Sequence, residues 1–166
     1  NETDQLAKTT NCVLIVVAGM LLLIELFGPE IIWVFGGSRY ASSVALLAPL
    51  CFGMYFSYLF QMFARVQEYY VRRLAIVIPS VLCAVLNVVL NLLLIPAIGY
   101  QAAAWTTAAS YLIFCCLHYA FYKRLCGRKG VEVYDMQGIL AVSGVYGTLN
   151  VVAVFLNMVP PVKYVL

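Results

Sequence analysis

Five apolar runs dominate this chain, and each is long enough to cross a lipid bilayer as a helix, which takes about 20 residues. The runs cover 9–28, 42–64, 74–95, 101–122 and 137–158. Hydrophobic residues make up 64% of the sequence and the mean hydropathy is +0.96, which leaves too little polar surface to keep 166 residues in water. The sequence therefore predicts an all-α integral membrane helical bundle of about five transmembrane helices, forming one transmembrane domain over residues 1–166.

Lysine and arginine fall mainly on one side of the predicted bundle. That side holds Lys8, Arg65, Arg72, Arg73, Lys123, Arg124, Arg128 and Lys129. Only Arg39 and Lys163 fall on the other side. Because basic loops mark the cytoplasmic side of a membrane, we expect a cytoplasmic amino end, with the 28–41 joint and the 98–101 turn outside. This topology accounts for the net charge of +3, so a nucleic-acid partner is not needed.

Two amides lie one helical turn apart inside the third apolar run. Asn87 and Asn91 share a helix face at i and i+4, among Val, Leu and Ile. An amide in hydrocarbon is costly unless it has a hydrogen-bond partner. We therefore expect both side chains to face either other helices or a wet cavity, and they are candidate substrate-binding residues.

Glu25 is an acidic residue near the end of the first apolar run. Gly28 and Pro29 follow it and predict a break in the helix, with a short second helical piece that starts at Pro29. Glu25 would then lie near the outer interface. One interpretation is an interfacial carboxylate that is solvated or paired with Arg39. The other is a proton- or cation-linked site in a transport cavity, because intramembrane acids are functional candidates.

A basic joint follows the second apolar run. It contains Arg65, Arg72 and Arg73. These residues are either topology anchors that face lipid phosphates or substrate-binding residues at the cytoplasmic mouth of a cavity. Arginine suits a pyrophosphate ligand because its guanidinium group can bind two oxygens at once.

Motifs for bond chemistry are absent from the sequence. The six cysteines match no metal or redox spacing, and His118 lacks a carboxylate at helical spacing. We therefore expect no catalytic residue, no metal site, no cofactor and no enzymatic activity. The small and hydroxylated residues of 102–111 favour a close helix-packing seam.

The two ends of the sequence suggest a segment of a longer protein. The amino end, 1–8, is polar and acidic and lacks an initiator Met, and 160–166 reads as the entrance to a further apolar stretch. We expect both ends to be truncated.

Several stretches resemble the second half of polysaccharide flippases of the Wzx type, which belong to the superfamily that includes peptidoglycan-lipid flippases and MATE exporters. The stretches are 27–40 (FGPEIIWVFGGSRY), 67–70 (QEYY), 86–104 (LNVVLNLLLIPAIGYQAAA) and 110–111 (SY). The likeness covers Leu6 to about Arg124 in order. It implies a carrier of the bacterial inner membrane with two helix bundles around a central cavity, of which this chain is the later part of the second bundle.

The resemblance also implies a cargo and partners. The cargo would be an undecaprenyl-pyrophosphate-linked oligosaccharide, moved outward for synthesis of cell-surface polysaccharide such as O-antigen, and the partners would be membrane lipids and other polysaccharide-assembly membrane proteins. Cationic residues holding the anionic cargo would point to Arg65, Arg72 and Arg73, and proton coupling would point to Glu25. A MATE-type drug or peptidoglycan-lipid exporter and a non-transporting membrane scaffold stay open as alternatives.

Overall fold

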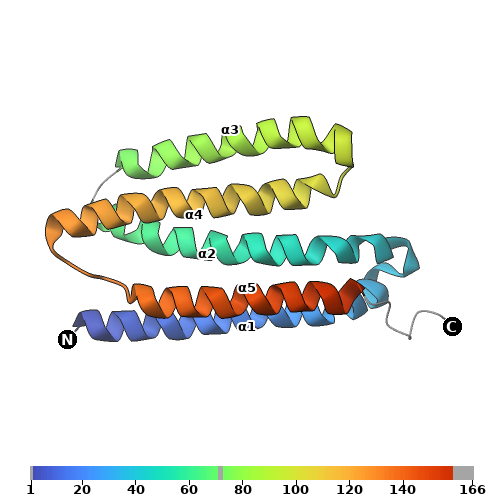
Figure 1. Cartoon of the computed structure of the whole chain (residues 1–166), viewed down its shortest axis with the longest axis horizontal. Coiled ribbons are helices and arrows are strands. Elements are labelled where there is room, and N and C mark those ends of the chain that lie inside the picture. The colour runs from blue at the N-terminus through green and yellow to red at the C-terminus, as the bar shows by residue number, and fades with distance from the viewer. Residues whose placement is uncertain (1, 71–72, 159–166) are drawn as a thin grey trace. The chain divides into compact units, whose positions relative to one another are not determined.

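Helices make up nearly all of the protein in the computed structural model, which describes residues 2–70 and 73–158. The elements are α1 (Glu2–Gly36), the 3-10 helix η1 (Ser38–Leu46), α2 (Leu47–Tyr69), α3 (Arg73–Ile98), α4 (Ala102–Lys129) and α5 (Met136–Met158) (Figure 1). The described residues contain no strand, so the predicted all-α class is confirmed. Four segments are long and apolar enough to cross a membrane, Gln5–Gly36, Ser38–Tyr69, Ile76–Ile98 and Met136–Phe155. The chain is therefore a multi-pass membrane protein by length and composition.

Helix α4 corresponds to the predicted run 101–122 but is not among those four segments. Residues 102–110 are Ala, Thr and Ser except for Trp105, and eleven side chains of the helix are buried. A helix that packs against protein on several sides does not need the large apolar surface of a lipid-facing helix. This difference fits the small-residue seam that the sequence predicts.

Helix α1 does not break at Gly28 and Pro29, so the predicted interruption is wrong. The helix runs without a gap to Gly36, and the chain turns at Gly37, which has a φ of 68°. Pro29 removes one backbone donor, which a long membrane helix tolerates when neighbouring groups compensate. Gly28 instead serves close packing, because a methyl group at this position would overlap Leu47 Cδ1 at the start of α2.

The chain forms two compact units. The first comprises Asn1–Cys51 and Tyr134–Leu166, and its helices α1 and α5 run parallel. At one end Asn11 Nδ2 donates to Asp135 Oδ2 at 3.0 Å. Asp135 also begins α5, since its Oδ1 accepts hydrogen bonds from the backbone amides of Gln137 and Gly138. One acidic residue thus caps one helix and binds the other.

The second unit, Phe52–Val133, contains most of α2 together with α3 and α4. Helices α3 and α4 form an antiparallel hairpin whose turn is made by Gly99, with a φ of 91°. Helix α2 lies parallel to α4, and their contact is aromatic: ring centroids are 4.3 Å apart for Phe60 and Phe114, and 5.3 Å apart for Phe63 and Tyr122. The outward side chains of α3 are exposed and apolar, as expected for a lipid-facing helix.

Gly53 sets how closely α2 approaches α4. A Cβ atom at this position would lie 3.2 Å from the Cα of Ala108, which is backbone and cannot rotate away. We expect Gly53→Leu to force the helices apart and to lower the free energy of unfolding in detergent by about 1 to 3 kcal/mol. Gly144→Leu is the matched control, because a Cβ atom at 144 meets no atom within 4 Å. Equal stability of the two variants would contradict this packing.

Candidate functional site

Glu25 is buried in the first unit and hydrogen-bonded to α5. Its side chain is fully inaccessible to solvent, and its Oε2 accepts a hydrogen bond of 2.8 Å from Asn150 Nδ2. The same Asn150 nitrogen lies 3.5 Å from the backbone carbonyl oxygen of Ala48. Three segments that are apart in the sequence therefore meet at the side-chain amide of Asn150.

The position of Glu25 corrects one sequence interpretation. Because α1 continues to Gly36, Glu25 lies about 16 Å along the helix axis from that end. Arg39 lies in η1 with its side chain exposed, whereas Glu25 is buried, so a solvated carboxylate is wrong. The proton- or cation-linked role of Glu25 stays a prediction.

Pro29 changes the backbone hydrogen bonding of the helix at Glu25. A proline cannot donate to the carbonyl four residues earlier, and here that carbonyl belongs to Glu25. The helical hydrogen bond that residue 29 would otherwise donate to the backbone of Glu25 is therefore missing from α1. Sequence reasoning missed Asn150, although, like Asn87 and Asn91, it is an amide within an apolar run.

Asn87 and Asn91 belong to a network of hydrogen-bonded polar side chains between α3 and α4. Asn91 Nδ2 donates to Asn87 Oδ1 at 3.0 Å, and Asn87 Nδ2 donates to Ser110 Oγ at 3.2 Å. Thr106 Oγ1 donates to Asn91 Oδ1, and Cys83 Sγ donates to the backbone oxygen of Ser110 at 3.2 Å. The amides therefore face another helix, one of the two surroundings that the sequence allows. Their part in binding a substrate stays a prediction.

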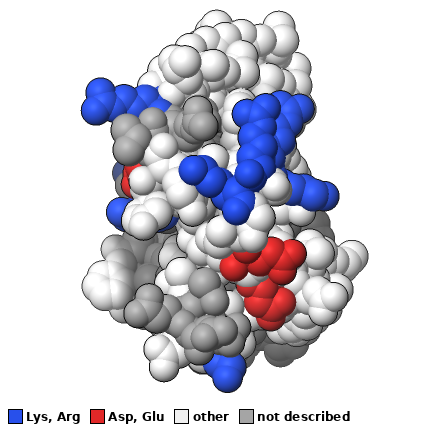
Figure 2. All heavy atoms as spheres, turned by 90° about the vertical axis from the view of Figure 1, so that its left-hand side faces the viewer, with Lys and Arg blue, Asp and Glu red and all other residues white. Residues whose placement is uncertain are grey.

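The arginines of the basic joint are only partly within the described residues. Arg65 and Arg73 are exposed at the end of α2 and the start of α3, and Arg72 lies outside the described residues. Figure 2 shows the cationic side chains gathered on the face that includes these helix ends. Both described arginines are free to meet an anion from outside the bundle.

A second buried polar pair joins α2 to α4, and sequence reasoning missed it. Gln67 Nε2 donates to the backbone oxygen of His118 at 2.9 Å, and Gln67 Oε1 lies 3.1 Å from His118 Nδ1. Both side chains are fully buried. Only the amide nitrogen of Gln67 can donate to the backbone oxygen of His118, so Gln67 Oε1 must face the imidazole ring. His118 Nδ1 therefore carries the imidazole hydrogen and donates it to Oε1.

The other nitrogen of His118 has no hydrogen-bond partner within the part of the chain that the structure describes. The rings of Phe60 and Phe114 lie against the imidazole, with centroids 5.6 and 4.6 Å from it. The side-chain amide of Gln67 thus bonds both the ring and the backbone of His118: its oxygen accepts from the ring Nδ1, and its nitrogen donates to the backbone oxygen. The one sequence signal for this pair is the amide side chain of Gln67 in the 64–73 joint.

We expect Gln67→Leu to lower the free energy of unfolding by about 1 to 3 kcal/mol, because it leaves the Nδ1–H group of His118 buried without an acceptor. Replacing both partners by apolar groups removes that penalty, so Gln67→Leu with His118→Phe is expected to recover part of the loss. Thermal unfolding in detergent compares the variants. A double variant that loses the full sum of the two single losses would contradict the pairing.

Metal chemistry gains no support from the described side chains, among which no three His, Cys, Asp or Glu residues gather. The six cysteines are free thiols. Comparison of the chain with protein-family models, curated proteins and solved structures gave no match.

Proposed function

We propose that the chain is part of a membrane transporter that translocates an undecaprenyl-pyrophosphate-linked oligosaccharide across the bacterial inner membrane for cell-surface polysaccharide synthesis. The observation that carries the proposal is Glu25, a carboxyl group buried within an apolar helix and bonded to Asn150. Ionisable groups at such positions are expensive, and they commonly mark an ion or substrate pathway. The resemblance of 27–40 and 86–104 to Wzx-type flippases supports this class of cargo.

A carrier of this kind makes and breaks no bonds. A pyrophosphate and several sugars would leave many polar groups unsatisfied in hydrocarbon, so a polar path through protein is the requirement. Arg65 and Arg73, with Arg72 beside them in the sequence, would meet the pyrophosphate at the cytoplasmic end. Glu25 would couple movement of the cargo to a proton or cation.

A non-transporting scaffold is a second candidate, favoured by a specific observation. The amides of Asn87 and Asn91 bond Ser110 and Thr106 across the α3 and α4 hairpin, which explains them as packing groups. A MATE-type drug or peptidoglycan-lipid exporter is a third candidate, and it shares the need for a buried polar path.

We expect Glu25→Gln to remove transport while the protein stays folded. Glutamine keeps the volume and an oxygen that can accept from Asn150 Nδ2, but it cannot take up or release a proton. In cells that depend on the native gene for surface polysaccharide, the variant should lower the polysaccharide by roughly tenfold or more at an unchanged protein level. Glu30→Gln, an exposed acid on the same helix, is the matched control and should transport normally.

Three outcomes would count against the proposal. Full surface polysaccharide with Glu25→Gln would remove the coupling role of this carboxyl group. Deletion of the gene without intracellular accumulation of lipid-linked oligosaccharide, but with increased drug sensitivity, would favour an exporter instead. Deletion that changes neither readout would favour the scaffold.

A further inference from the structure

All the charged side chains in the described part of the second unit lie at one end of it. We call this the cationic end, formed by the end of α2, the start of α3 and the end of α4. Its basic residues, all exposed, are Arg65, Arg73, Lys123, Arg124, Arg128 and Lys129. Glu68 and Glu132 are the acidic residues there, and 74–122 contains no Asp, Glu, Lys or Arg. The cationic end thus carries a large excess of positive charge.

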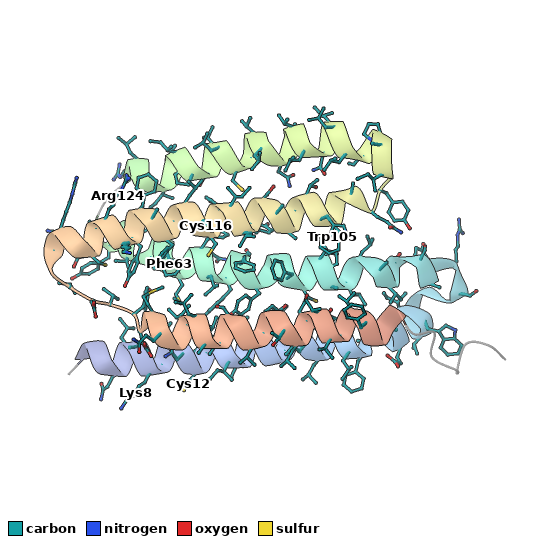
Figure 3. All side chains as sticks on the ribbon, in the orientation of Figure 1. Lys8, Cys12, Phe63, Trp105, Cys116 and Arg124 are labelled. Atoms are coloured by element: carbon teal, nitrogen blue, oxygen red, sulfur yellow. The ribbon has the colours of Figure 1, made fainter. Side chains whose placement is uncertain are left out.

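The cationic end lies at the depth of the phosphate layer of a bilayer. Trp105 and Arg124 lie at opposite ends of α4 (Figure 3), and the helix between Trp105 and Tyr122 is about 26 Å long. A hydrocarbon core is about 30 Å thick. Helix α3 crosses the same thickness, bonded to α4 through Asn87 and Ser110. The cations that follow Tyr122 therefore emerge where lipid headgroups begin.

Helix electrostatics do not account for the whole cationic end. Arg128 and Lys129 lie in the last turn of α4, where the helix dipole favours positive charge. Arg73 instead begins α3, where the dipole disfavours a cation. Lys123 and Arg124 precede the last turn. The helix dipole therefore does not explain the positive charge at these three positions.

Arg124 and Arg128 are spaced to share one anion. They lie at i and i+4 on one face of α4, where two like charges destabilise a helix by about 0.2 to 0.5 kcal/mol. Among the described residues, neither guanidinium group has a carboxylate partner in an ion pair. Lys129 points elsewhere, since its Nζ lies 5.3 Å from the ring centroid of Tyr70. A phosphate between the two arginines would turn their repulsion into bidentate binding.

We propose that the cationic end is a binding site for anionic phospholipid headgroups, with the lipid phosphate held between Arg124 and Arg128. Arg73 and Lys123 supply further positive charge around that phosphate. The depth of the site favours a lipid over a soluble acidic partner, and the exposed ring of Tyr69 is typical of the membrane interface. The proposal does not depend on the transport function.

The test is thermal unfolding of the purified full chain in a neutral detergent, with added phosphatidylglycerol or phosphatidylcholine. A ligand that binds only the folded state raises the unfolding midpoint. We expect phosphatidylglycerol to raise it by several degrees and phosphatidylcholine to have little effect. In R124Q/R128Q the shift with phosphatidylglycerol should fall to the level seen with phosphatidylcholine. R39Q, which removes an exposed cation of η1, is the matched control and should keep the full shift.

Three results would overturn the proposal. Equal shifts with the two lipids would exclude a charge-selective site. An undiminished shift in R124Q/R128Q would place the lipid elsewhere. The same shift with inorganic phosphate or pyrophosphate alone would assign the site to a free anion.

If R124Q/R128Q does not fold, R124K/R128K is the second variant, because it keeps the charge without bidentate binding. It should need more phosphatidylglycerol for the same shift, and an unchanged requirement would contradict the arginine pair.

Discussion

The structure depends on the cost of a polar side chain without a partner among apolar helices. Each unit meets that cost in its own way. In the first unit, the carboxyl group of Glu25 takes its hydrogen bond from Asn150. In the second unit, the amides of Asn87 and Asn91 bond across the hairpin to α4. Because such bonds need partners at defined positions, they fix which faces of apolar helices meet, which apolar contact alone does not specify.

The positions of the helices could be predicted from the sequence, because a membrane-spanning helix needs a long apolar run and the runs are separated by polar joints. The predicted break at Pro29 was wrong, since helix ends depend on what surrounds them. Gly28 reads locally as a turn residue, but its role is to admit Leu47 of α2. That contact joins segments distant in the sequence, and no local pattern encodes it.

The candidate site was only half predictable for the same reason. Glu25 stands out in the sequence because an acidic residue within an apolar run is unusual. Its partner, Asn150, is 125 residues away, and only the pairing of α1 with α5 brings the two together. Gln67 and His118 are likewise ordinary as single residues, and they become a buried polar pair only when α2 packs against α4.

The parallel pairing of α1 and α5 limits how these helices can move. Two polar links join them, Asn11 with Asp135 and Glu25 with Asn150, fourteen residues apart on α1 and fifteen on α5. A slide of one helix along the other by a single turn, about 5.4 Å, would break both links at once. The two links therefore fix the register of the pair, and a conformational change of the first unit would move α1 and α5 together.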